Sequence, residues 1–86
     1  MYYLYVLRSL KDNKLYIGVT ENIVRRVSEH NAGKNKSTRF RRPFILIYQK
    51  IFIEKGEAYK YEWFVKNTGK GNKALKQSIS AEMAEP

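Results

Sequence analysis

The sequence predicts an α+β sandwich (α/β class), with a three-stranded, mainly antiparallel sheet flanked by helices in the order β-β-α-β-α-α. Two short apolar segments near the N-terminus are separated by a polar cluster, as in a β-hairpin, and a longer apolar segment follows further along the chain. Apolar residues recur at helical spacing before and after that third segment. Because 86 residues supply one small core, we expect a single domain over residues 1–80 and an acidic, frayed tail over residues 81–86.

The first two segments, residues 2–8 and 15–20, predict the strands of the hairpin. In both segments, successive side chains are expected on opposite faces, and the residue types favour strands. Residues 11–14 between them are polar, as in a turn. In the second segment, Tyr16 and Gly18 lie on the same face. A glycine weakens a strand, so this one indicates that a ligand or another backbone comes close.

The next segment predicts a helix that runs from a cap at Thr20 or Asn22 to about Ala32. At 100° per residue, its inward stripe consists of Ile23, Val24, Val27 and Asn31. Arg26 and His30 lie one turn apart along an edge of this stripe, so we expect their side chains to point the same way.

Residues 33–43 show no apolar periodicity, and Gly33 is well placed to end the preceding helix. An irregular segment of this length in so small a domain is usually functional or mobile. Residues 44–53 then predict a long strand, apolar enough to be central in the sheet and covered on both faces.

Residues 57–66 return to helical spacing, with Glu62 at the margin of the apolar stripe. The inward residues of this helix are Ala58, Tyr61 and Val65. Residues 69–71, which include two glycines, predict a break, and a short last helix follows before the tail.

The chain is strongly basic, with a net charge of +9 and a pI near 9.9. Between Arg25 and Lys50 there are eight basic residues and one acid, a net of +7 in 26 residues. Such a patch indicates a polyanionic partner, with nucleic acid first and an anionic membrane surface second. No helix combines a basic face with a broad exposed apolar face, which favours nucleic acid over a membrane.

Cysteine is absent, which excludes a disulfide framework, a thiolate metal cluster and a cysteine nucleophile. The apolar start of the chain lacks the basic leader and cleavage site of a signal peptide, and no run reaches the length of a membrane span. We therefore expect the protein in the cytoplasm.

Five polar residues that could carry chemistry are brought towards one place by this arrangement: Tyr5, Tyr16, Arg26, His30 and Glu62. Each also has a structural explanation. The tyrosines could be strand packing residues, and Arg26 could pair with carboxylates at the solvent-exposed surface. His30 could be a hydrogen-bonded helix residue, and Glu62 the partner of Lys66 at i,i+4 spacing.

Their order along the chain nevertheless forms a pattern with further short motifs. The motifs are Tyr3-Leu4-Tyr5, Tyr16-Ile17-Gly18, Arg26 with His30, Thr38-Arg39 with Arg42-Pro43, and Glu57-Ala58 with Glu62 and Lys66. Together they resemble the GIY-YIG nuclease superfamily, and most closely its small stand-alone bacterial members, over about residues 2–80. Tyr3-Leu4 stands where the name-giving members have Gly-Ile.

The resemblance implies an endonuclease that hydrolyses phosphodiester bonds with one divalent metal ion, Mg²⁺ or Mn²⁺. It implies Glu62 as the metal ligand, Arg26 as the cation on the scissile phosphate, Tyr5 and Tyr16 as hydroxyls around the attacking water, and His30 as a helper. It also implies a setting in DNA repair or recombination.

The chemistry of these residues favours a single metal ion and does not decide which residue is the general base. Mg²⁺ prefers oxygen ligands and keeps several waters, so one carboxylate and a phosphate are enough to hold it. Tyrosine has an ordinary pKa near ~10 and is a poor proton acceptor at neutral pH, whereas histidine, near ~6.5, is the easier base if it faces the phosphate. Either Tyr5 or Tyr16 is the base candidate, the other orients, and His30 supports them.

The irregular segment supplies the candidate nucleic-acid contacts, which are Lys34, Lys36, Arg39, Arg41 and Arg42. We expect a nucleic-acid partner, with DNA ahead of RNA. The alternative is a nucleic-acid-binding module without significant catalytic activity, which explains the charge equally well. A purely structural domain explains neither the clustered charge nor the motifs.

Overall fold

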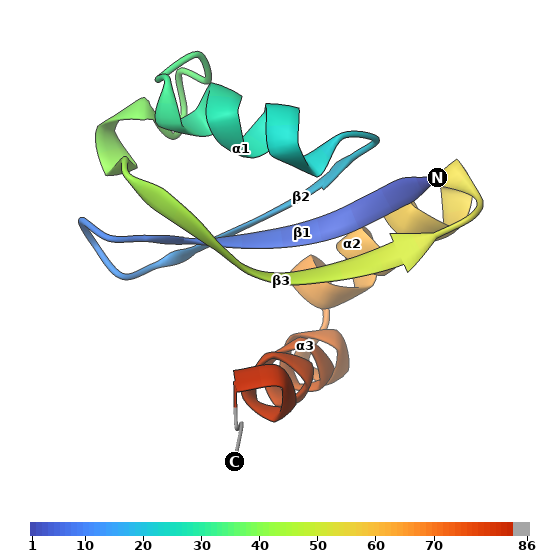
Figure 1. Ribbon diagram of the computed structural model, residues 1–86. Helices are drawn as coiled ribbons and strands as arrows, with labels where there is room; N and C mark the ends of the chain where they lie inside the picture. The colour runs from blue at the N-terminus through green and yellow to red at the C-terminus, as the bar shows by residue number, and fades with distance from the viewer. Residues whose placement is uncertain (84–86) are drawn as a thin grey trace.

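Three antiparallel strands form one sheet in the order β2-β1-β3, with helices on both sides of it (Figure 1). The structure is a computed structural model and describes residues 1–83. The elements are β1 (Tyr2–Ser9), β2 (Leu15–Thr20), α1 (Ile23–Asn31), the 3-10 turn η1 (Arg39–Arg41), β3 (Phe44–Phe52), α2 (Lys55–Asn67) and α3 (Gly69–Met83). The predicted fold class and element order are confirmed.

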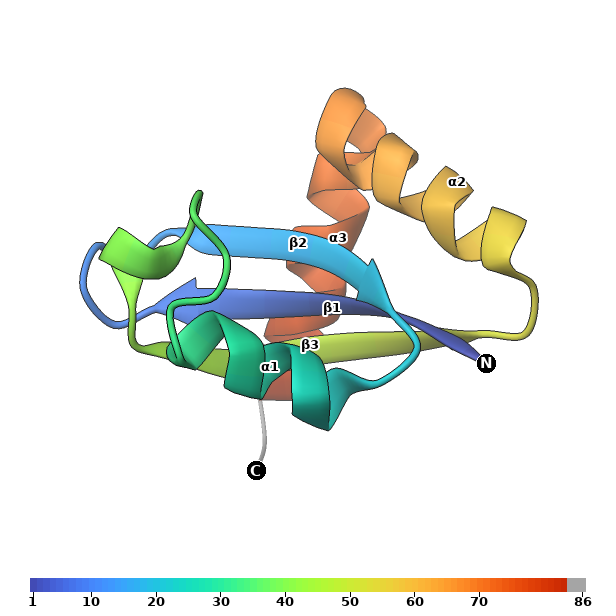
Figure 2. The ribbon, with the colours of Figure 1, turned by 90° about the horizontal axis from the view of Figure 1, so that it is seen from above.

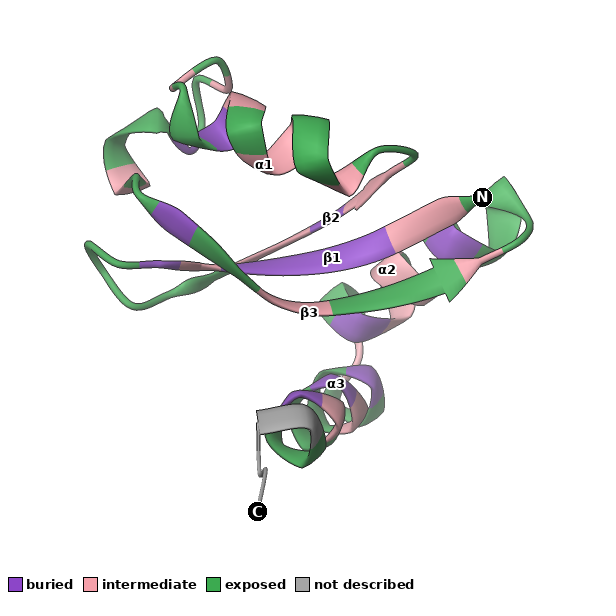
Figure 3. Ribbon diagram, in the orientation of Figure 1, coloured by how far each residue is buried: buried purple, intermediate pink, exposed green. Residues whose placement is uncertain are grey.

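The middle strand, β1, is buried on both faces because each face is covered by a different set of helices (Figure 3). Tyr5 and Leu7 point to the α1 side, where they pack with Phe44 and the partly buried Ile23 and Val27. The alternate residues point to the other side. There the core consists of Leu4, Val6, Val65, Leu75 and Ile79. The sheet therefore separates two small cores.

The third strand, β3, is an edge strand, so the expectation that it would be central is wrong. Its side chains Ile45, Leu46 and Ile51 are 37%, 38% and 53% exposed. Both β1 and β3 have apolar runs, and the run in β1 is the one buried on both faces, as is typical of a central strand.

Helix α1 begins at Ile23 and is capped by Asn22, one of the two predicted caps, whose side chain accepts a hydrogen bond from the Arg25 N–H. Gly33 follows the helix with φ +77°. The predicted inward stripe needs correction, because Val24 is 82% exposed and His30 is fully buried. The residues that face the sheet are Ile23, Val27 and His30, at i, i+4 and i+7.

The break between α2 and α3 lies at Thr68, and not at residues 69–71 as predicted, because those residues form the first turn of α3. Thr68 has an extended backbone, and its hydroxyl oxygen accepts the Gly71 N–H at 2.9 Å. A side chain at Gly71 would collide with the Phe64 carbonyl oxygen. The glycine thus allows α3 to start directly against the end of α2.

Helix α3 continues to Met83 and is longer than the short helix predicted. Residues 81–83 of the expected tail are thus helical, and residues 84–86 lie outside the described part of the chain. Within residues 1–83, no helix is both long and apolar enough to cross a membrane.

Candidate active site

A chain of buried polar groups begins at His30. Its Nε2 lies 3.1 Å from the Tyr5 hydroxyl, and its Nδ1 lies 2.9 Å from the hydroxyl of Thr38. All three residues have at most 1% exposure. They come from α1, β1 and the loop before η1, so three separate elements meet at one imidazole ring.

Arg26 extends this chain towards the surface. Its Nε donates to the Tyr5 hydroxyl at 3.3 Å, and its Nη1 donates to the Glu29 carboxylate at 3.1 Å. About a third of the Arg26 side chain is exposed. The guanidinium therefore contacts a buried hydroxyl while part of it remains open to a ligand.

The glycine on β2 is required by Tyr5. Gly18 pairs with Tyr5 across the two strands, and a Cβ at this position would lie 2.5 Å from the Tyr5 hydroxyl oxygen. A close approach was predicted at Gly18, and the group that approaches is a tyrosine side chain and not a ligand or another backbone.

Tyr16 lies next to the same cluster. Its ring centroid is 4.8 Å from that of His30, edge to face, and 6.3 Å from that of Tyr5. Tyr16 is half-buried, in contrast to the fully buried Tyr5. The two tyrosines thus differ in their access to solvent.

The electrostatics of the cluster keep its central groups neutral. Burial raises the pKa of Tyr5, opposed mainly by the hydrogen bond from Arg26. Burial, with a further contribution from the positive charge of Arg26, lowers the pKa of His30. The hydrogen bond to Tyr5 raises the pKa of Arg26. Tyr5 is therefore a phenol and His30 a neutral imidazole at pH 7.

Glu62 lies on α2, which packs on the opposite core from α1 (Figures 1 and 2). Burial is the main cause of the raised pKa of Tyr5, and the negative charge of Glu62 is the smallest of the contributions that raise it. The Glu62 side chain is 19% exposed and pairs with Lys66 at 2.9 Å, the i,i+4 contact expected from the sequence. Within the described residues, no group of three or more His, Cys, Asp or Glu side chains lies close enough together to hold a metal ion.

The basic residues of the loop fall into two groups. Lys34, Lys36, Arg39 and Arg42 are exposed. Arg41 instead donates from Nε to Asp12 at 2.9 Å and from Nη2 to the Leu15 carbonyl at 3.3 Å. The Lys14 N–H and, to a smaller extent, Arg41 lower the pKa of Asp12. Arg41 thus ties the loop to the β-hairpin.

Two residues of the cluster's framework had no role assigned from the sequence. Thr38 lies in the irregular loop, where periodicity carries no signal for burial. The Asn31 side chain accepts the Phe44 N–H at 2.7 Å and donates to the Phe44 carbonyl at 3.1 Å, which fixes the end of α1 to the start of β3. The only sequence signal for the contact between Thr38 and His30 is the place of Thr38 in the Thr38-Arg39 motif.

Comparisons with known proteins show the family of this chain. Residues 1–74 match the GIY-YIG catalytic domain, and the chain belongs to this family. It is 42% identical to a UPF0213 protein of Staphylococcus haemolyticus over 84% of this chain and 88% of that protein. It is 44% identical to a UPF0213 protein of Bacillus licheniformis over 84% of this chain and 74% of that protein.

A solved structure is similar as well. The solution NMR structure of a UPF0213 protein from Bacillus halodurans shares 37% identity, with a TM-score of 0.53, over 92% of this chain and 85% of that chain. The family to which the chain belongs is one of nuclease type, and its UPF0213 relatives are small stand-alone bacterial proteins.

Proposed function

We propose that the protein is a metal-dependent endonuclease that hydrolyses phosphodiester bonds, with the proton of the attacking water passing through Tyr5 to His30. The observation that carries this proposal is the continuous line Arg26, Tyr5, His30 and Thr38, with hydrogen bonds of 2.9–3.3 Å. One hydrogen-bond partner would satisfy the hydroxyl of a packing tyrosine, whereas the Tyr5 hydroxyl contacts both a guanidinium and an imidazole. Membership of the GIY-YIG family supports the reaction class.

The proton path follows from the protonation states. We assign the His30 proton to Nδ1, donated to Thr38 Oγ1, so that Nε2 accepts the Tyr5 O–H. As water attacks phosphorus, an O–H bond of that water breaks and its proton passes to the Tyr5 oxygen, while the proton of Tyr5 passes to His30 Nε2. The new P–O bond forms as the bond to the leaving oxygen breaks, and that oxygen takes up a proton from bulk water to leave as a hydroxyl group. No free tyrosinate is needed, which suits a phenol of raised pKa.

Arg26 stabilises the negative charge that develops on the phosphoryl oxygens. Its planar guanidinium suits a phosphate better than an ammonium group does, and its fixed contacts with Tyr5 and Glu29 orient it before substrate binds. The positive charge of Arg26 also favours loss of the proton from Tyr5, because Arg26 Nε donates a hydrogen bond to the Tyr5 hydroxyl oxygen.

The residues present fit a single divalent ion at Glu62. A carboxylate oxygen that is part exposed, together with water and a substrate phosphate, is a suitable donor set for Mg²⁺ or Mn²⁺. When bound, the ion supplies positive charge at the phosphate. Lys66 must then give up its contact with Glu62.

The substrate we propose is nucleic acid, with DNA ahead of RNA. The four exposed cations of the loop, Lys34, Lys36, Arg39 and Arg42, supply phosphate contacts, and Arg41 is reserved for the hairpin. A setting in DNA repair or recombination and a location in the cytoplasm stay predictions.

The test compares Glu62→Gln with Glu54→Gln. Both variants remove one negative charge at α2, and Glu54 precedes the helix without a side-chain capping bond. With Mg²⁺ or Mn²⁺ and labelled nucleic acid, we expect Glu62→Gln to lose cleavage by orders of magnitude while retaining binding, and Glu54→Gln to cleave as the wild type does. Equal cleavage by both variants would contradict the role of Glu62.

The second candidate function is nucleic-acid binding without cleavage, favoured by the pairing of Glu62 with Lys66. It predicts that the wild type binds nucleic acid and cleaves none with either metal, and that a chelator changes nothing.

A further inference from the structure

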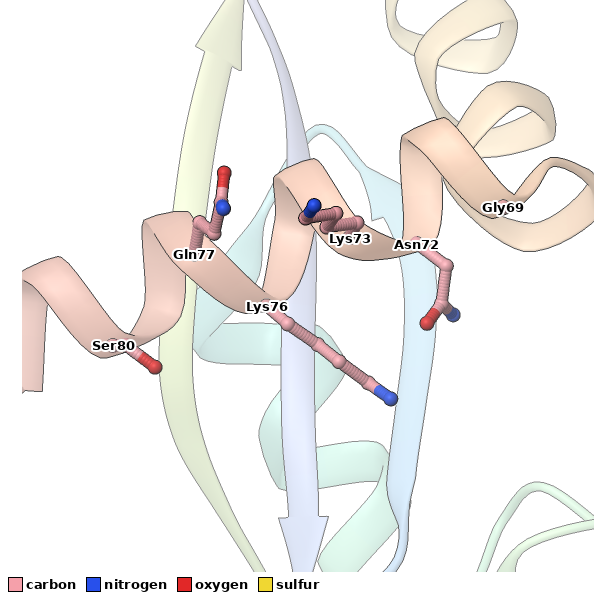
Figure 4. Close-up of a pocket in the computed structure, with 6 residues that line it drawn as sticks. All are labelled: Gly69, Asn72, Lys73, Lys76, Gln77 and Ser80. Atoms are coloured by element: carbon pink, nitrogen blue, oxygen red, sulfur yellow. The ribbon is translucent and has the colours of Figure 1, made fainter.

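The side of α3 turned away from the sheet carries an open hollow of about 660 Å³ (Figure 4). Its lining comes from α3 alone and consists of Gly69, Asn72, Lys73, Lys76, Gln77 and Ser80. Figure 4 shows these side chains projecting from the helix, with the strands of the sheet behind it. The side chains that line the hollow are polar or charged, and carbon atoms make up most of its surface.

The charged residues of α3 up to residue 81 are all basic. Residues 69–81 contain Lys70, Lys73 and Lys76 and no acid, whereas α2 carries acids and lysines together. None of the ion pairs among residues 1–81 involves these three lysines. Lys70 lies in the first turn of α3, where the helix dipole disfavours a positive charge. Lys70, Lys73 and Lys76 follow one another at i,i+3 spacing, so an anion at this surface would reduce their mutual repulsion.

The chemistry of the hollow suits a nucleic-acid backbone. Lysine ammonium groups neutralise phosphates, and the amides of Asn72 and Gln77 can donate hydrogen bonds to phosphate or sugar oxygens. These contacts position a strand without reading its sequence.

The hollow lies on the opposite side of the sheet from α1 and the basic loop (Figure 1). The molecule measures 31 × 30 × 26 Å. Duplex DNA is stiff over about 150 base pairs, so one short linear duplex cannot contact both sides. Phosphates on α3 must therefore belong to a different segment from the one at the candidate active site.

We propose that the α3 side binds the phosphates of a second nucleic-acid segment, so that the protein prefers a branched nucleic acid over a linear duplex. The inference rests on the proposed function for the identity of the polyanion, and it adds a second contact surface and a substrate shape.

The test uses Lys73→Gln/Lys76→Gln and, as a matched control, Lys55→Gln/Lys60→Gln. All four lysines are exposed on helices, and both variants lower the net charge from +9 to +7. The probes are a three-way DNA junction with short arms and a linear duplex of one arm, bound without divalent metal over a range of salt.

We expect the wild type to bind the junction more tightly than the duplex. The α3 variant should lose that preference, and the slope of log K against log salt on the junction should shrink by up to about 1.8, or ~0.9 for each phosphate that is no longer neutralised. The control should keep the preference. A wild type without preference, an α3 variant that retains it, or an equal weakening of binding in both variants would overturn the proposal.

The two proposals fail separately. If the wild type binds the junction with the expected lysine dependence and cleaves nothing with Mg²⁺ or Mn²⁺, the nuclease proposal fails and the α3 surface stands. If the wild type cleaves nucleic acid and the α3 variant binds as the control does, the α3 proposal fails and the nuclease proposal stands. If it binds neither probe at any salt concentration, both fail.

Discussion

His30 has no exposed surface, yet both of its ring nitrogens have hydrogen-bond partners. A buried polar group without a partner costs about 1–3 kcal/mol. The hydroxyls of Tyr5 and Thr38 remove that cost and allow a histidine at a position of α1 that faces the core. The same two bonds fix the orientation of the ring, so in the proposed reaction the place of the proton acceptor is set by packing before substrate binds.

The burial of His30 predicts a pH dependence of stability. Because its pKa is lowered in the folded protein, the unfolded chain takes up the proton at a higher pH than the folded chain does. The free energy of unfolding should therefore fall as the pH is lowered from about 6.5 to the pKa of the folded state, and this contribution should be constant below that.

Urea unfolding of the wild type and of His30→Gln between about pH 7.5 and pH 5.5 measures this contribution. We expect a flatter profile in the variant, whatever its absolute stability. Parallel profiles for the two proteins would mean that His30 has the same pKa folded and unfolded.

Strand pairing decides where the phenol of the candidate site lies. The β1–β2 register sets Tyr5 opposite Gly18, and the ring occupies the space that a side chain on β2 would fill. Helix α1 then covers that ring, with His30 and Arg26 one turn apart. Two strands and one helix thus hold the hydroxyl against both of its partners.

Gly18→Ala should disturb this arrangement. The added methyl group would overlap the Tyr5 ring and hydroxyl, all fully buried, so we expect a loss of stability of about 1–3 kcal/mol together with slower cleavage. Chemical denaturation and a cleavage assay under the same conditions measure both effects.

Gly56→Ala is the control for this change. Gly56 lies on α2 with open space around its Cβ position, so alanine there should stabilise the helix by about 0.5–1 kcal/mol and leave cleavage unchanged. Similar effects from both alanines would show that the contact between Tyr5 and Gly18 is unimportant.

Over the whole molecule, the charged side chains lie outside the two cores. The net charge of +9 is concentrated on the loop after α1 and, on the other side of the sheet, on α3. The cations of the loop are not equivalent, because Arg41 is held by Asp12 and the hairpin while Arg39 and Arg42 are exposed.

Salt dependence of binding should separate these arginines. For a linear duplex, Arg39→Gln/Arg42→Gln should reduce the slope of log K against log salt by up to about 1.8, because each phosphate contact contributes ~0.9. Arg41→Gln should leave the slope nearly unchanged and lower the free energy of unfolding. Filter binding and urea denaturation provide the two measurements.

The assignment of Arg41 to the hairpin would be contradicted if Arg41→Gln reduced the slope as much per residue as the double variant does. In that case its contact with Asp12 would give way to phosphate when nucleic acid binds.

Local sequence patterns determined the element types and order of this fold. Alternation placed β1 and β2, the Asn22 cap and Gly33 bounded α1, and helical spacing located α2. Residues of the candidate site could also be predicted from the sequence, because Arg26 and His30 are one turn apart and Gly18 shares a face with Tyr16. These features depend on neighbours in the chain, which a sequence shows directly.

The tertiary structure alone decided which strand is central, that His30 is buried while Val24 is exposed, and that Thr38 completes the polar chain. Both β1 and β3 are apolar enough for the middle of the sheet, and helix phase alone left His30 at the edge of the stripe. Thr38 is eight residues from His30 in an irregular loop, and only the folded loop brings their side chains together. Each of these outcomes depends on contacts between distant segments, whose free energies a local pattern does not contain.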